Sequence, residues 1–217
     1  MDLSDLVASS YHVVAIVAYT IGIVLLARNF RNLATRLTAL TLFSYSAWAV
    51  LFYAVQETAG FDEELIGFTL FVRSLFYPLL YLTIRSFRGV ERYDYLSLCI
   101  PIVVLVYILL FEPIGTFQIN PQVYYWDVII PLFATFLILL NIMIYIGYRT
   151  YKEITDLSTK EKFFYLVFAF SLMGYIRAFE MFSYHTFGVA FTGLPHLIAL
   201  GILIYPFLLK RKKERIR

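Results

Sequence analysis

The residues most able to do chemistry in this chain are ionisable side chains inside apolar runs. Arg73 lies in one such run, and Arg177 and Glu180 lie in another. A spacing of three places Arg177 and Glu180 on the same face of a helix. Charged groups within hydrophobic segments are energetically costly and usually have a function. Because an arginine fork can bind a carboxylate through two hydrogen bonds, these residues predict a pocket for a small anionic ligand.

Four other side chains are predicted to line the same pocket. Their types are those of a small-molecule site, which has aromatic walls and a few convergent polar groups. They are Trp48, Tyr77, Asn141 and His196. An alternative remains open, in which Glu180 pairs with Arg73 or Arg177 and the pair only locks two helices together.

Three histidines raise the separate question of a metal or haem site. Each of His12, His185 and His196 lies near the end of an apolar run. Zinc sites have ligands at short, fixed spacings, and no such spacing joins these three residues. We therefore predict no bound metal and no cofactor.

The signatures of several enzyme classes are absent from the sequence. It contains no G-x-S-x-G, H-E-x-x-H, G-x-G-x-x-G or phosphate-binding loop motif. A retinal chromophore needs a lysine inside the last apolar run, where the first lysine is Lys210 at the very end. The single cysteine, Cys99, allows no intramolecular disulfide. We predict that the protein is not an enzyme.

The composition predicts the kind of element that must position these residues. Hydrophobic residues make up 61% of the 217 residues and charged residues 15%, whereas soluble globular chains average ~45–50% and ~25%. A soluble core of this size cannot bury so much apolar surface, so the lipid bilayer must surround it. The formal net charge is +3. Because the basic residues lie between apolar runs, membrane topology explains them better than binding to nucleic acid.

Seven apolar runs are each long enough for a helix that crosses ~30 Å of hydrocarbon. We therefore predict an all-α integral membrane protein, a seven-transmembrane helix bundle that forms one domain over residues 1–210, with a basic tail at residues 211–217. Ser158 followed by Glu161 predicts a capping box at the start of the sixth helix. The predicted spans are 11–28, 37–56, 65–86, 95–112, 127–148, 163–184 and 191–210.

The charges between these spans alternate along the chain. Links one, three and five and the tail are rich in Lys and Arg, whereas the second link is acidic and the sixth has neither Lys nor Arg. Basic links stay in the cytoplasm. The pattern therefore predicts an N-terminus outside, a C-terminus in the cytoplasm, and a multi-pass protein of the cell membrane. With this orientation, most of the candidate ligand residues lie in the outer half of the bundle.

A weak internal repeat favours a different function. Tyr77-Pro78 in the third span and Tyr205-Pro206 in the seventh occur in similar apolar contexts. They are compatible with a parallel three-plus-one-plus-three repeat, as in some small transporters. A transporter also needs a polar path to the cytoplasmic side, and the sequence predicts that this path is closed. The only candidates for it are Asn141, Tyr145 and Tyr148.

Trp48 with Phe52 in the second span, and residues 73–87 (RSLFYPLLYLTIRSF) in the third, carry a family resemblance. They resemble the seven-helix membrane region at the N-terminus of some prokaryotic sensor histidine kinases and related signalling proteins. The resemblance implies a sensor that signals to a separate cytoplasmic partner, either as a module of a longer chain or as a stand-alone receptor-like protein. The sixth span departs from the family because it lacks a proline.

Three functional hypotheses follow from these observations. The first is a receptor-like sensor with an outer-half pocket for a small anionic ligand, which signals through its cytoplasmic loops. The second is a small transporter, and the third is an accessory subunit of a membrane complex. All three share one predicted partner, the lipid bilayer.

Overall fold

The computed structural model describes residues 3–57, 63–111, 130–187 and 193–214, and it describes side chains over residues 9–54, 67–110, 131–179 and 193–206. Every regular element within these ranges is a helix, which confirms the predicted all-α class. The elements are α1 (Leu3–Asn29), α2 (Leu33–Glu57), α3 (Glu63–Ser74), α4 (Phe76–Arg85), η1 (Arg92–Leu98), α5 (Cys99–Phe111), α8 (Ile130–Glu153), α9 (Leu157–Phe187) and α10 (Leu194–Glu214).

Six helical stretches in the described residues are long and apolar enough to cross a membrane. They overlap the first six predicted spans, with the ends of the fifth and sixth displaced by several residues, the third being α3 with α4 and the fourth η1 with α5. A seventh apolar segment, Leu194–Pro206, is shorter and belongs to α10. The chain is therefore a helical bundle of the multi-pass membrane type. The predicted tail begins as helix, because α10 continues to Glu214.

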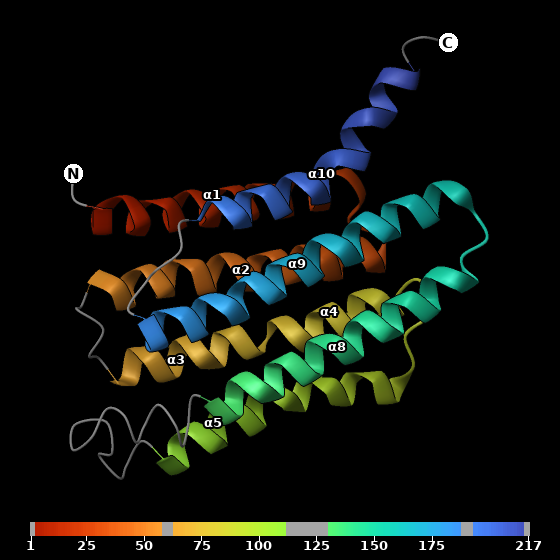
Figure 1. The fold of residues 1–217 in the computed structure, drawn as a ribbon. Helices are drawn as coiled ribbons and strands as arrows, with labels where there is room; N and C mark the ends of the chain where they lie inside the picture. The colour runs from red at the N-terminus through yellow and green to blue at the C-terminus, as the bar shows by residue number, and fades with distance from the viewer. Residues whose placement is uncertain (1–2, 58–62, 112–129, 188–192, 215–217) are drawn as a thin grey trace.

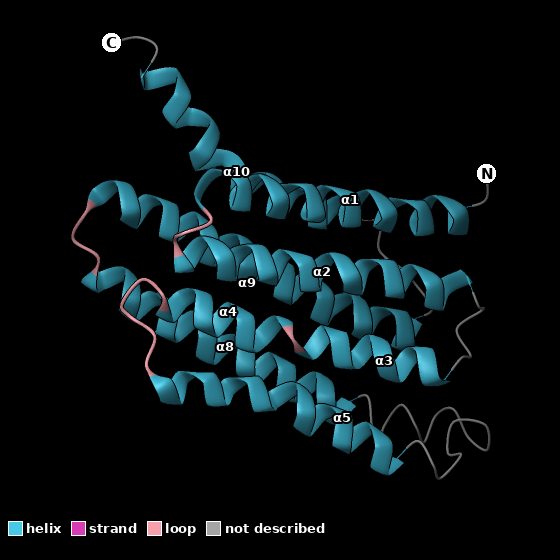
Figure 2. Ribbon diagram, turned by 180° about the vertical axis from the view of Figure 1, so that it is seen from behind, coloured by secondary structure: helices cyan, strands magenta, loops and turns pink. Residues whose placement is uncertain are grey.

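The helices lie side by side along a common direction (Figures 1 and 2), and their contacts form a closed ring with α5 outside it. Around the ring, α1 packs on α2, α2 on α3 and α4, α4 on α8, α8 on α9, α9 on α10, and α10 back on α1. The remaining helix, α5, packs against α3 and lies at the edge of the bundle. Side chains from these seven helices thus meet inside the ring, where a buried site can form.

Proline explains why the third span is broken into two helices. A proline has no amide hydrogen, and its ring clashes with the carbonyl four residues earlier. Pro78 lies in α4, and the residue four positions before it is Ser74, where α3 ends. Pro206 lies inside α10, and the helix beyond it projects away from the bundle (Figures 1 and 2).

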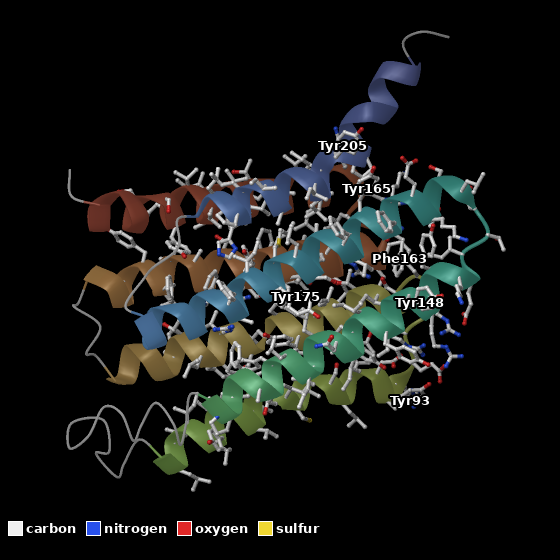
Figure 3. The ribbon with its side chains drawn as sticks, viewed as in Figure 1. Tyr93, Tyr148, Phe163, Tyr165, Tyr175 and Tyr205 are labelled. Carbon is white, nitrogen blue, oxygen red and sulfur yellow. The ribbon has the colours of Figure 1, made fainter. Side chains whose placement is uncertain are left out.

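The two Tyr-Pro pairs of the predicted repeat occupy different environments. Tyr77 is 2% exposed and stacks on a ring inside the bundle, whereas Tyr205 is 45% exposed and lies at the bend of α10 (Figure 3). The likeness in sequence therefore does not extend to the packing of the two tyrosines.

Side-chain caps mark the starts of α2 and α9. The Asn32 side-chain oxygen accepts a hydrogen bond from the Thr35 amide at 3.1 Å, and Asp156 accepts one from the Thr159 amide at 2.7 Å. Both are the standard N-cap interaction. The predicted cap at Ser158 is wrong, because α9 begins at Leu157 and Asp156 precedes it. Asp and Ser are equally good caps, so the motif alone selected the wrong residue.

The cap at Asp156 makes the stability of α9 dependent on pH. Hydrogen bonds from Thr159 to the carboxylate lower the pKa of Asp156 below its usual value. A carboxyl with a lowered pKa in the folded state adds stability above its ordinary pKa of about 4, and this contribution is lost as the pH falls further. Asp156→Asn keeps a capping oxygen without the titration. We expect thermal unfolding curves at pH 7 and pH 3 to differ less for Asp156→Asn than for the wild type.

A glycine permits the close approach of α10 to α1. A side-chain carbon at Gly193 would lie 2.7 Å from the Ser10 backbone oxygen, and the Gly193 amide donates a hydrogen bond to the Ser10 hydroxyl at 2.6 Å. A methyl group there forces the two helices apart. We expect Gly193→Ala to lower the free energy of unfolding by about 1–3 kcal/mol, measured by denaturation in mixed micelles.

Gly201, which lies inside α10, provides a control for Gly193, which immediately precedes that helix. A side-chain carbon there meets nothing within 4 Å, and alanine favours helix more than glycine by roughly 1 kcal/mol. Gly201→Ala should therefore be neutral or stabilising. Equal losses at Gly193 and Gly201 would contradict the close-approach explanation.

A polar latch joins η1 to α4 at the end of the bundle opposite the start of α1. The Asp94 carboxylate is buried and accepts hydrogen bonds from the Tyr81 hydroxyl, from Arg85 Nε at 3.1 and 3.2 Å, and from the Glu91 amide at 2.8 Å. The latch stabilises the turn in which the chain reverses direction between the third and fourth spans. The sequence showed these charges only as part of a basic link.

Candidate functional site

Arg177 of α9 lies inside the ring against three aromatic faces. Its side chain is 2% exposed. The guanidinium carbon lies 4.0 Å from the ring centroid of Trp48, 5.1 Å from that of Tyr45 and 5.2 Å from that of Phe76. These distances are within the range of attractive cation–π contacts, which strengthen when water is excluded. The rings therefore stabilise a positive charge within the core.

His196 connects α10 to the same aromatic group. It is fully buried, and its Nδ1 is hydrogen-bonded to the Tyr45 hydroxyl. Its ring centroid lies 5.6 Å from that of Trp48 and 5.9 Å from that of Tyr11. Helices α1, α2, α9 and α10 thus meet at this histidine and at Arg177.

Arg73 of α3 occupies a neighbouring position. It is 4% exposed, and its guanidinium carbon lies 5.3 Å from the ring centroid of Phe136 on α8. Phe136 stacks on Tyr77 with centroids 4.9 Å apart, and Tyr77 meets Phe76 edge-on at 5.6 Å. A continuous chain of rings therefore joins the two arginines. We name the whole group the arginine–aromatic cluster: Tyr45, Trp48, Arg73, Phe76, Tyr77, Phe136, Arg177 and His196.

Local spacing places most of this cluster. Tyr45 and Trp48 are three residues apart and share a face of α2. Arg73, Phe76 and Tyr77 are spaced by three and four, across the break between α3 and α4. Tyr45, Phe76 and Phe136 were not predicted from the sequence. The first two could have been found from their spacing to the predicted residues, whereas Phe136 is one of many apolar residues in α8 and carries no such signal.

Asn141 does not belong to the cluster, contrary to the prediction that it lines the pocket. It is exposed, donates a hydrogen bond to the Leu137 carbonyl at 2.8 Å, and accepts one from the Tyr175 hydroxyl at 2.9 Å. This pair links α8 and α9 on the outer surface of the bundle, where Figure 3 labels Tyr175.

The remaining predicted residues divide into two groups. Glu180 and His185 lie outside the described side chains. His12 is exposed and packs against Tyr53 with ring centroids 3.9 Å apart. Among the described residues, no group of three or more His, Cys, Asp or Glu side chains is placed to hold a metal ion.

The cluster lies in the half of the bundle where α1 begins. Tyr11, in the first half of α1, contacts His196 near the start of α10. A neighbouring apolar groove of about 520 Å³ lies on the outer face of α8 and α9. Its lining includes Ala178 and Pro195, the chain neighbours of Arg177 and His196. The groove therefore lies beside the cluster along the chain, and no cluster residue lines it.

No family model, curated protein or solved structure matches this chain. The residues themselves must therefore indicate the function. Their arrangement supplies two desolvated positive charges, a buried histidine–tyrosine hydrogen bond and a wall of rings. Such a group can attract and orient a small anion, because guanidinium groups form charge-assisted hydrogen bonds with carboxylates.

Proposed function

We propose that this chain is a membrane sensor that crosses the bilayer seven times, with α10 as the seventh span. The N-terminus lies outside and the C-terminus in the cytoplasm. The alternation of basic and acidic links supports this orientation. A salt bridge of 2.6 Å between Arg88 and Glu153 joins the third link to the end of α8, where the fifth link begins. These two basic links therefore lie at the same end of the bundle, as the alternation requires.

The observation that carries the proposal is the burial of two arginines inside a membrane-type bundle. Moving a charge out of water costs several kcal/mol even after relaxation. Apolar side chains of similar volume would pack a ring of helices at no such cost. Two arginines, Arg73 and Arg177, are nevertheless 4% and 2% exposed. We infer that their charge is retained because it binds a small anionic ligand, which enters from the outside.

The α10 helix provides a route from this cluster to the cytoplasm. His196 lies near its start, within the cluster, and the part beyond Pro206 projects from the bundle (Figure 1). A ligand that displaces the rings around His196 would shift α10 relative to α2. A separate partner at the cytoplasmic face would then sense the position of the projecting helix. A separate cytoplasmic partner is also what the resemblance to histidine-kinase sensor regions implies.

Ligand-dependent stability tests this function. Binding to the folded state stabilises it by RT ln(1 + L/Kd), where L is the ligand concentration, so the gain grows with the logarithm of the ligand concentration once the site is mostly occupied. We expect native mass spectrometry of the purified protein, followed by thermal unfolding with a panel of small carboxylates and phosphate, to identify an anion that raises the melting temperature. The rise should disappear in Arg73→Ala and Arg177→Ala and persist in Arg149→Ala, where the arginine is exposed.

A purely structural role gives a different result in the same experiment. If the two buried arginines only lock helices together, Arg73→Ala and Arg177→Ala lower the melting temperature but respond to every anion as the wild type does. That outcome would overturn the sensor proposal and favour an accessory subunit.

The transporter hypothesis has no support from the placement of its polar residues. Tyr145 is 61% exposed and Tyr148 is 54% exposed, and both lie with Asn141 on the outside of the ring. These three residues were the only candidates for the inner part of a transport path. We therefore do not propose transport.

A further inference from the structure

A second cavity lies at the opposite end of the bundle from the arginine–aromatic cluster. It has a volume of about 290 Å³ and is enclosed by α1, α2, α9, α10 and the link after α4. Its lining separates into two parts. The deep part is apolar except for Thr38, whose hydroxyl donates a hydrogen bond to the Ala34 carbonyl, and its apolar residues are Ile21, Leu25, Leu166, Leu203, Ile204 and Phe87.

The mouth of this cavity is polar and positively charged. Arg28 reaches it from the end of α1, and Lys162 reaches it from the first turns of α9. Neither residue forms a salt bridge with another described residue. The carboxylate of Asp156 lies near Lys162 but is engaged in capping α9. Amides and hydroxyls complete the mouth: Asn29, Asn32, Thr35 and Thr159.

The shape and chemistry of the cavity identify its occupant. The distance along α1 from Arg28 to Ile21 is about 10 Å at ~1.5 Å per residue. The positively charged mouth and the apolar side chains below it therefore belong to one small site. A volume of about 290 Å³ is large compared with the ~30 Å³ share of one water molecule in the liquid. It is small for a folded peptide, whose backbone groups would also lack partners in the apolar part.

We propose that this cavity binds one anionic phospholipid of the cytoplasmic leaflet. Its phosphate lies between Arg28 and Lys162, and the first part of an acyl chain occupies the apolar depth. Basic pockets between helices at the cytoplasmic side are suited to anionic headgroups. The inference depends on the membrane architecture and its orientation. It does not depend on the ligand proposed for the arginine–aromatic cluster, because no residue is shared between the two sites.

Lipid retention tests this site directly. The full chain would be reconstituted into phosphatidylcholine nanodiscs with or without phosphatidylglycerol, and retained lipids would be counted by native mass spectrometry. We expect the wild type to retain one phosphatidylglycerol. The double variant Arg28→Gln/Lys162→Gln should weaken this binding by roughly 30-fold, since each basic side chain near an anionic surface contributes a factor of about five.

Two further variants separate the cavity from general surface charge. Ala34→Phe fills the cavity but keeps both charges, because Ala34 is part of the lining. It should abolish retention. Arg31→Gln/Arg149→Gln removes the same charge from exposed positions outside the lining, and it should leave retention unchanged. Circular dichroism and size-exclusion profiles would verify that each variant is folded.

Defined outcomes overturn the proposal. Retention by Ala34→Phe together with loss in Arg31→Gln/Arg149→Gln would show that lipid is attracted only by surface charge. A rise in melting temperature with inorganic phosphate that equals the rise with phosphatidylglycerol would show a site for a free anion instead of a lipid. Either result would leave the proposed sensor function untouched, because the Arg73 and Arg177 variants test that function separately.

Discussion

Asp94→Ala lowers the free energy of unfolding by about 3 kcal/mol in the expected result. Removing one member of a buried charge pair is strongly destabilising, because the other charge is left without compensation. The Asp94 side chain is fully buried, and that of its partner Arg85 is 15% exposed. The substitution also leaves the Tyr81 hydroxyl and the Glu91 amide without their acceptor. Equilibrium unfolding of the purified protein in mixed micelles measures the change.

Glu91→Ala is the matched control for this latch. The Glu91 side chain is 60% exposed and lies 3.6 Å from Arg85. Exposed ion pairs contribute little, at most about 1 kcal/mol, and the backbone amide that bonds to Asp94 remains in the alanine variant. We expect a loss below about 1 kcal/mol. Similar losses for Glu91→Ala and Asp94→Ala would show that the latch is not stabilised by its buried carboxylate.

Arg177→Ala has the second large expected effect, a loss of about 3 kcal/mol in unfolding free energy. Desolvated cation–π contacts contribute about 2 kcal/mol or more, and truncation of a buried side chain also leaves a cavity. Arg73→Ala should also be destabilising, because the Arg73 guanidinium is buried against the ring of Phe136. The same micelle denaturation measures both variants.

A lysine variant and tryptophan fluorescence provide two further tests of the role of Arg177. Arg177→Lys keeps the charge but loses the planar group that stacks on the rings, so it should recover only a small part of the stability. Trp48 reports the environment of the site once the other tryptophan is replaced in a Trp126→Phe background. We expect its emission to shift to longer wavelength in Arg177→Ala as water enters. Full recovery by lysine, with unchanged emission, would contradict the importance of the stacked guanidinium.

Hydropathy determined the helical class and most element positions. The first six predicted spans fall on helices because about 20 consecutive apolar residues have no alternative to a buried or membrane-spanning helix. The ends of the helices were less predictable. Asp156 caps α9 where Ser158 was predicted, and Pro78 divides the third span at Ser74. These details depend on which polar side chain reaches an amide and on how a proline is accommodated.

The candidate site was likewise predicted only in part from the sequence. Charge inside an apolar run pointed to Arg73 and Arg177, because burial of an ionised group is costly enough to be visible from sequence alone. The structure places both with Trp48, Tyr77 and His196 in one cluster. Their meeting required the closed ring, in which α10 returns to α1 and α8 packs on α4.

The sequence by itself determined that this protein is a bundle of apolar helices with a few charged residues within them. Only the tertiary structure decided which residues face one another. A helix in a membrane is apolar on its lipid face and on its packed face, because lipid tails are as apolar as leucine. Hydrophobic periodicity therefore could not separate the two faces of α8. For this reason Asn141 was predicted to lie inside the bundle and Phe136 was not predicted to be part of the site. In the structure Asn141 is on the surface and Phe136 packs against Arg73.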